Sequence, residues 1–150
     1  MEQYKGGCSC GSVRFELDAR PLWVLACHCN ACKKRTGSAY GISVMAERSS
    51  VRLQGEPKAF IRKGDSGKDV RYEFCPHCGT TIRWMVAAMP NLQGFAGGAF
   101  DNFQVLSPIA EMYTADAAQW ALLGCGLTTP RSPDDEFRRK MAARQAQQKD

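Results

Sequence analysis

The chain has 150 residues, of which 44% are hydrophobic, and this is enough to form the core of one domain. No apolar run is long enough to span a membrane and no apolar secretory signal is present, so we expect a cytoplasmic protein with no membrane partner. The formal net charge of +5 is not gathered into a basic stripe with interleaved aromatic residues, which argues against nucleic-acid binding.

Most of the chain is expected to form short strands. Residues 12–17 alternate, with Val13, Phe15 and Leu17 on one face. Further strands, rich in β-branched and aromatic residues, are predicted at residues 22–26, 40–46, 51–54, 59–62, 70–74, 80–86 and 109–114. Between them we expect a helical turn at residues 30–36 that ends at Gly37, a turn at residues 63–68 and a short helix at residues 116–122.

The end of the chain has a different composition and is predicted to contain a short helix. Ser132 is a candidate N-cap, Pro133 suits the first helical position, and acidic residues follow at the positive helix end. Phe137 and Met141 are four residues apart and are expected to anchor this helix. Residues 145–150 are polar and are expected to fray.

The cysteines form three clusters along the sequence. They are Cys8 and Cys10, then Cys27, Cys29 and Cys32, and finally Cys75 and Cys78. Cysteines two positions apart on an extended chain face the same side and can bind one ion, whereas a disulfide between them is strained. In the C-P-H-C-G segment, proline and glycine allow a tight turn that points N–H groups at both sulfurs. Such clusters in a chain without a secretory signal indicate metal ligands.

The seven clustered cysteines divide into one group of four and one of three. A closed structural zinc takes four ligands, whereas a catalytic zinc takes three and keeps one position open. We therefore expect a structural zinc at Cys8, Cys10, Cys75 and Cys78, and a catalytic zinc with an open position at Cys27, Cys29 and Cys32. Two zinc ions and seven thiolates would lower the formal charge to about +2.

An alternative is that all seven cysteines are structural and that the group of three borrows a fourth ligand. Cys125 is the less favoured candidate for that ligand, and a buried inert thiol or an incidental residue is the favoured explanation for it. His28 and His77 each lie between two ligand cysteines, so their side chains should point away from the metal that their neighbours bind.

Four segments together resemble a known family. They are G-G-C-S-C-G-S-V-R-F-E, C-H-C-N-A-C-K-K-R-T-G, G-D-S-G and F-C-P-H-C-G-T-T-I-R-W, in this order. The chain thus resembles the glutathione-dependent formaldehyde-activating enzyme family, of which centromere protein V is a relative, over roughly residues 6–121. The resemblance implies a mainly β, compact, zinc-bound fold of the β-tent type with short antiparallel strands, and the same division of zinc ligands. We expect this domain at residues 1–122 and a partly helical, partly flexible extension at residues 123–150.

The resemblance also implies an activity, that of a carbon–sulfur lyase acting on an adduct of glutathione or another small thiol. An example is the formation of S-hydroxymethylglutathione from formaldehyde and glutathione. An open zinc can bind the thiol and lower its pKa, so Cys27, Cys29 and Cys32 are candidate catalytic residues. The alternative function is a non-catalytic zinc module that binds a thiol, a protein or nucleic acid.

Several other residues are weaker candidates for substrate contacts. Lys33, Lys34 and Arg35 follow the group of three cysteines and are candidates for binding a glutathione carboxylate, although a solvated basic turn explains them about as well. Turn chemistry is the favoured explanation for Asp65 and Ser66. Trp84, Phe95 and Phe100 are expected in the core, with a substrate wall as the less favoured alternative.

Overall fold

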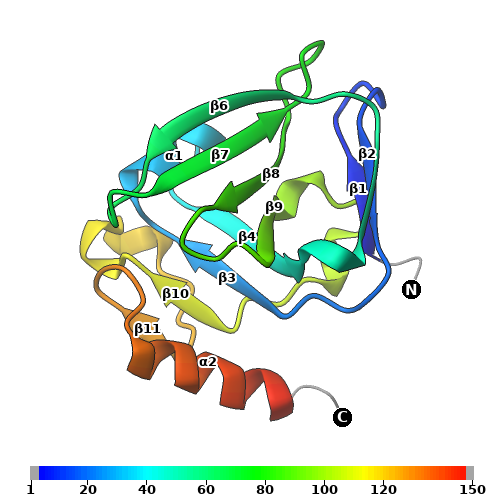
Figure 1. The fold of residues 1–150 in the computed structure, drawn as a ribbon. Coiled ribbons are helices and arrows are strands. Elements are labelled where there is room, and N and C mark those ends of the chain that lie inside the picture. The colour runs from blue at the N-terminus through cyan, green and yellow to red at the C-terminus, as the bar shows by residue number, and fades with distance from the viewer. Residues whose placement is uncertain (1–3, 148–150) are drawn as a thin grey trace. The chain divides into compact units, whose positions relative to one another are not determined.

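The computed structural model describes residues 4–147 and is mainly β with two α-helices, as predicted. Figure 1 labels the helices and strands along the chain. The chain forms two units, each made of two separate stretches of sequence. Unit 1 combines the stretch up to Leu22 with Val44–Leu106, and unit 2 combines Trp23–Ser43 with the stretch that begins at Ser107. The expected boundary at residue 122 stays a prediction. No described helix is long and apolar enough to cross a membrane.

Unit 1 contains antiparallel strands. One sheet has the order β1-β2-β5, and its strands are β1 (Lys5–Gly7), β2 (Arg14–Leu17) and β5 (Val51–Gln54). A second run has the order β6-β7-β8-β9, with β6 (Lys58–Lys63), β7 (Asp69–Phe74), β8 (Thr81–Val86) and β9 (Leu92–Ala96). Short 3₁₀ turns lie at Arg48–Ser50, Gly97–Ala99 and Phe103–Val105.

Two strands of unit 1, β1 and β9, were not predicted. Both contain glycine, which weakens the sequence signal of a strand. In β9, a Cβ atom on Gly94 would lie 2.4 Å from the ring of Trp84 on β8, so only glycine lets this ring lie against the strand. This strand is therefore marked by a glycine that lets an aromatic ring lie against its backbone, and not by the β-branched residues from which the other strands were predicted.

The core of unit 1 is built around aromatic rings. The ring of Phe15 lies 4.6 Å from that of Phe95 and 5.0 Å from that of Phe100, measured between centroids. Trp84 is buried as well, and its ring contacts that of Tyr72. The expectation that Trp84, Phe95 and Phe100 belong to the core is confirmed.

The strands β11 (Thr128–Thr129), β10 (Ala110–Met112) and β3 (Trp23–Cys27) of unit 2 pair in parallel, whereas antiparallel strands were expected. Their order in the sheet is β11-β10-β3. Helix α1 (Asn30–Thr36) follows β3, and helix α2 (Asp135–Gln147) ends the described chain. Strand β4 (Gly41–Glu47) begins in this unit and continues into unit 1.

The short helix expected at residues 116–122 is wrong. Two 3₁₀ turns, Thr114–Asp116 and Gln119–Ala121, occupy this part of the chain. Between them, Ala117 and Ala118 have extended backbone angles, with ψ values of 141° and 133°. This extended pair prevents the turns from merging into one helix.

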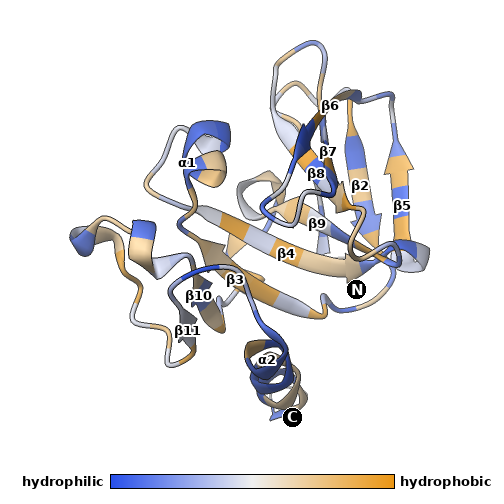
Figure 2. Ribbon diagram, turned by 60° about the vertical axis from the view of Figure 1, so that its left-hand side comes forward, coloured by the Kyte–Doolittle hydropathy of each residue, from blue (hydrophilic) through white to orange (hydrophobic). Residues whose placement is uncertain are grey.

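Helix α2 packs on the sheet of unit 2 through two side chains. Phe137 and Met141 are buried in one cluster with Leu25, Ile109 and Ala110, so the expectation that they anchor the helix is confirmed. The rest of α2 is mostly hydrophilic, whereas β3 is mostly hydrophobic (Figure 2). Burying each anchor contributes about 2 kcal/mol, so tertiary packing stabilises a helix that is otherwise polar.

The N-cap of α2 is Asp134 and not Ser132. Its Oδ1 accepts a hydrogen bond of 2.8 Å from the N–H of Phe137, and the helix begins at Asp135. Pro133 therefore precedes the cap, where its fixed φ directs the chain but does not open the helix. The helix continues to Gln147, so fraying at residues 145–147 is not seen, and residues 148–150 lie outside the described part.

We expect Asp134→Ala to lower the free energy of unfolding by about 1 kcal/mol, because it leaves N–H groups of the first turn without an acceptor. Equilibrium denaturation in urea measures this loss. Ser132→Ala is the matched control and should change stability by less than about 0.5 kcal/mol. A larger loss of stability for Ser132→Ala than for Asp134→Ala would contradict this assignment and support Ser132 as the N-cap.

Candidate metal centres

The first group of cysteines lies in unit 1, where two loops meet. Cys8 and Cys10 lie between β1 and β2, and Cys75 and Cys78 lie between β7 and β8. The four sulfur atoms all lie within 4.8 Å of one another. The Cys10 sulfur lies 3.5 Å from that of Cys8 and 3.7 Å from that of Cys75. All eight cysteines are free thiols, so this group can hold a metal ion.

The turn after β7 directs backbone N–H groups at sulfur, as expected for a C-P-H-C-G segment. Gly79 has φ of 75°, and its N–H donates to the carbonyl of Cys75 over 2.9 Å. Burial raises the pKa of Cys75 to about 11, although the N–H groups of Cys78 and His77 oppose this shift. The hydroxyl and N–H of Thr80 lower the pKa of Cys78 to about 5.

The second group lies in unit 2, at the junction of β3 and α1. Cys27 is the last residue of β3, Cys29 is the N-cap of α1, and Cys32 lies in the first turn of this helix. The sulfur of Cys29 accepts a 3.3 Å hydrogen bond from the N–H of Cys32. Helix α1 ends at Gly37 in the left-handed conformation, which confirms the predicted helical turn. The strand end and the helix start thus bring all three sulfurs within 4.8 Å of one another.

The three thiols of unit 2 share their protons unequally. The thiols of Cys27 and Cys32 donate to the sulfur of Cys29 and lower its pKa to about 2, with help from backbone N–H groups. Donation to Cys29 raises the pKa of Cys27 above its ordinary value. A set of three sulfur donors fits a borderline-soft cation such as zinc.

Within residues 4–147, no fourth histidine, cysteine or carboxylate lies within this distance of all three sulfurs. His28 and Cys125 belong to neither group, and nor does His77. The expectation that both histidines point away from the metal stays a prediction, and nothing here supports Cys125 as a ligand. The ligand assignments themselves stay predictions.

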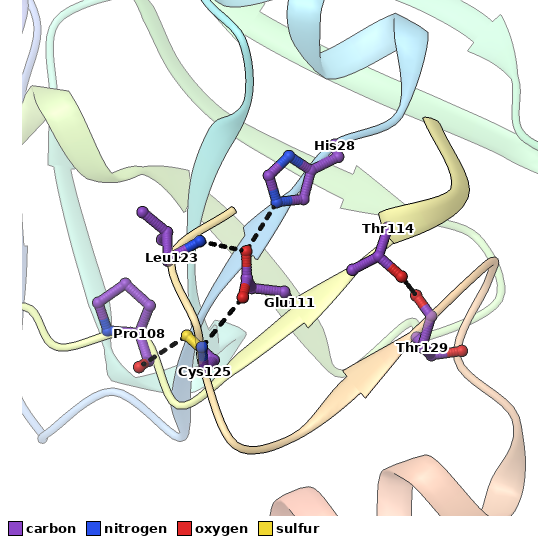
Figure 3. A network of polar contacts seen from close by, with 7 residues as sticks. All are labelled: His28, Pro108, Glu111, Thr114, Leu123, Cys125 and Thr129. Carbon is purple, nitrogen blue, oxygen red and sulfur yellow. Dashed lines mark hydrogen bonds and ion pairs between the residues drawn. The ribbon is translucent and has the colours of Figure 1, made fainter. Parts of the chain in front are cut away.

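His28 has a buried partner that the sequence analysis missed. The side chain is fully buried, and its Nε2 lies 2.9 Å from Oε1 of Glu111 on β10 (Figure 3). The ring of Tyr40 lies 5.4 Å from the imidazole, measured between centroids. The available signal was an acidic residue between the apolar Ala110 and Met112 in a predicted strand.

Glu111 is charged although it is buried. Burial raises the pKa of this carboxyl group, but hydrogen bonds from Leu123 N–H, from His28 and from Cys125 N–H outweigh burial and hold it below its ordinary value. A carboxylate can only accept, so Nε2 of His28 carries the proton of their hydrogen bond. This bond fixes the residue that separates two of the three clustered cysteines.

The basic residues after Cys32 have different surroundings. The ammonium of Lys33 donates to the carbonyl of Asp116 and lies 3.4 Å from Oδ1 of Asn30. The guanidinium of Arg35 lies 4.0 Å from the sulfur of Cys32. Lys34 is exposed. Their binding of a carboxylate stays a prediction.

The segment that contains Asp65 and Ser66 forms a turn in unit 1, as predicted. The N–H of Gly64 donates to the carbonyl of Lys68 over 2.8 Å, and the hydroxyl of Ser66 accepts from the N–H of Lys68 over 3.4 Å. Both contacts close the turn between β6 and β7. This geometry supports turn chemistry as the reason for the two polar residues.

Residues 3–116 match the sequence model of the family described as glutathione-dependent formaldehyde-activating enzyme. The chain belongs to this family. The match includes both cysteine groups and stops before residues 117–150. The structure is also similar to the crystal structure of a Rhodobacter sphaeroides protein, a structural-genomics target. The sequences are 24% identical, the alignment covers 65% of this chain and 87% of that one, and the TM-score is 0.47.

We expect Cys75→Ser to destabilise the fold far more than Cys29→Ser. Cys75 is fully buried and belongs to a group that joins two loops distant in sequence, whereas Cys29 is half-buried in a local group. A metal that joins distant segments contributes its binding energy to folding. Thermal melts of metal-loaded protein test this ranking, and Cys125→Ser is the control from outside both groups. Equal losses for Cys75→Ser and Cys29→Ser would contradict it.

Proposed function

We propose that the protein is a zinc-dependent carbon–sulfur lyase that acts on an adduct of glutathione or another small thiol. The formation of S-hydroxymethylglutathione from formaldehyde and glutathione is the reaction that fits best. The observation that carries this proposal is the group of three sulfurs, which no fourth side-chain ligand joins among the described residues. Membership of a family of glutathione-dependent formaldehyde-activating enzymes supports the choice of substrates.

The two cysteine groups would then have different roles. Cys8, Cys10, Cys75 and Cys78 have the number of donors that a closed structural zinc needs. Cys27, Cys29 and Cys32 have the number that leaves a position for a substrate. The chain would therefore bind two zinc ions, one structural and one catalytic.

Zinc held by Cys27, Cys29 and Cys32 would lower the pKa of an incoming thiol and so raise its thiolate fraction at neutral pH. In the reaction, the glutathione sulfur attacks the carbonyl carbon of formaldehyde and a carbon–sulfur bond forms. The π electrons of the carbonyl move to its oxygen, which takes up a proton from solvent to balance the one lost by the thiol. In the reverse direction the carbon–sulfur bond breaks.

The chain's own residues set the charge of this site. Three thiolates exceed the charge of one divalent cation, so strong polarisation of the carbonyl is not expected, and the protein contributes mainly thiol placement. The exposed Lys34, and Arg35 beside Cys32, are the better placed cations for a glutathione carboxylate. Lys33 is less suitable because its ammonium already donates to the carbonyl of Asp116.

A first test is the metal content of the protein purified with zinc present. We expect about two zinc ions per chain for the wild type and about one for Cys29→Ser, because only the group of three loses a ligand. Elemental analysis together with a protein assay gives these values. A constant value of one zinc per chain in zinc-replete wild type would count against two sites.

A second test uses cobalt in place of zinc, because cobalt makes a sulfur-ligated site visible by absorption. Adding glutathione should change the ligand-field and sulfur-to-metal bands of the wild type, and Cys29→Ser should abolish this response. S-methylglutathione is the matched control, since it keeps both carboxylates but lacks the thiol. No spectral response to any thiol at millimolar concentration would show a closed site and refute the proposal.

Turnover separates the lyase from a thiol-binding module. Exchange between free formaldehyde and S-hydroxymethylglutathione can be followed by NMR, with the uncatalysed rate subtracted. The proposal expects acceleration by the wild type and loss of that acceleration in Cys29→Ser. A cobalt site that binds glutathione without accelerating exchange would favour the non-catalytic zinc module instead.

A further inference from the structure

Glu111 is the meeting point of three segments of unit 2. Its Oε1 accepts from His28 Nε2 over 2.9 Å and from the N–H of Leu123 over 2.8 Å, and its Oε2 accepts from the N–H of Cys125 over 3.0 Å (Figure 3). The carboxylate is 1% exposed. Both of its oxygens are therefore occupied by donors from this protein.

One of these three donors connects the carboxylate to the group of three cysteines. His28 lies between Cys27 and Cys29, and its backbone N–H also donates to the carbonyl of Met112 over 3.0 Å. Strand β10, which contains Glu111 and Met112, therefore holds His28 by both its main chain and its side chain. A fixed His28 limits the directions in which the two neighbouring sulfurs can point.

The other two donors come from outside the region that matches the family. The match ends at residue 116, whereas Leu123 and Cys125 follow it and reach Glu111 through main-chain N–H groups. The side chain of Leu123 is 43% exposed, so its main chain and not its side chain carries the contact.

We propose that residues 123–125 and Glu111 form a brace that positions the site of Cys27, Cys29 and Cys32 by holding His28. Glu111 is a positioning residue here, since it acts on the sulfurs through His28. The brace sets the metal affinity and the ligand geometry of this site, and it makes a segment beyond the family match part of the functional unit. The inference rests on the metal site of the proposed function, but not on its substrate or reaction.

The sharpest test removes the N–H group of residue 123 and controls for the side chain that is lost with it. Leu123→Pro removes the donor, and Leu122, with φ of −68° and ψ of 129°, already has a conformation that a following proline accepts. Leu123→Ala is the matched control, because it removes the exposed side chain and keeps the N–H. Chelator competition with cobalt measures affinity at the group of three cysteines, and absorption reports its geometry.

We expect about tenfold weaker cobalt binding and shifted sulfur-to-metal bands for Leu123→Pro, as is typical when an outer partner of a metal site is lost. Leu123→Ala should behave as the wild type. Glu111→Gln should show the same loss by a second route, because an amide has one acceptor oxygen and would turn its NH₂ group toward a donor.

A general loss of stability would not reproduce this pattern. Glu73 is a buried carboxylate of unit 1 that accepts from Arg83 over 2.7 Å and from Arg71 over 3.2 Å, so Glu73→Gln is a control of similar chemistry. The brace predicts that Glu73→Gln leaves the cobalt bands of the group of three cysteines unchanged. Equal cobalt affinity and equal spectra for wild type, Leu123→Pro and Glu111→Gln would overturn the brace.

The two proposals can fail separately. If no thiol alters the cobalt spectrum of the wild type, the lyase proposal fails, while metal affinity in the variants still supports or overturns the brace. A loss of the same size in Glu73→Gln and Glu111→Gln would overturn the brace even if the wild type accelerates the exchange of formaldehyde with glutathione.

Discussion

The gathering of cysteine sulfurs into two small groups is the constraint on which the rest of the structure depends. Thiolates at such short separations repel one another unless protons or a cation lie between them. In unit 2, hydrogen bonds from the two neighbouring thiols lower the pKa of Cys29, and in unit 1, hydrogen bonds from Thr80 lower the pKa of Cys78. The cysteines lie at the ends of strands and in the connections that follow them, so the strands bring these segments together and the turns orient the sulfurs.

Unit 2 contains a buried carboxylate, Glu111, connected to the group of three cysteines through its hydrogen bond with His28. Glu111 loses water on burial and regains three hydrogen bonds, so it is costly to bury but well satisfied. Such a group has one stable arrangement, because moving any donor leaves a buried charge short of a partner. For the metal site proposed at Cys27, Cys29 and Cys32, a single arrangement around His28 would compensate for the fourth ligand that a closed centre has.

Local signals made much of this structure predictable. Helix α1 and its end at Gly37 follow from the residues of that segment, and the alternation of Val13, Phe15 and Leu17 marked β2. The missed features depend on partners distant in sequence. In the sequence, Gly94 only weakens the signal of a strand, and its reason is the ring of Trp84 that lies against it in the structure. The sequence likewise gives no reason for Glu111, which accepts a hydrogen bond from the distant Leu123. The N-cap of α2 differs for a local reason, because both Ser132 and Asp134 suit that position and packing of Phe137 selects the second.

The contacts from residues 123 and 125 to Glu111 use main-chain N–H groups, which every amino acid except proline supplies. Substitution of either residue by any amino acid except proline therefore leaves the donor of this contact in place. The two contacts therefore depend on the path of the main chain and on the absence of proline at these two positions, and they place no demand on the side chains there. Residues beyond the family match can thus hold a buried carboxylate without any recognisable sequence motif.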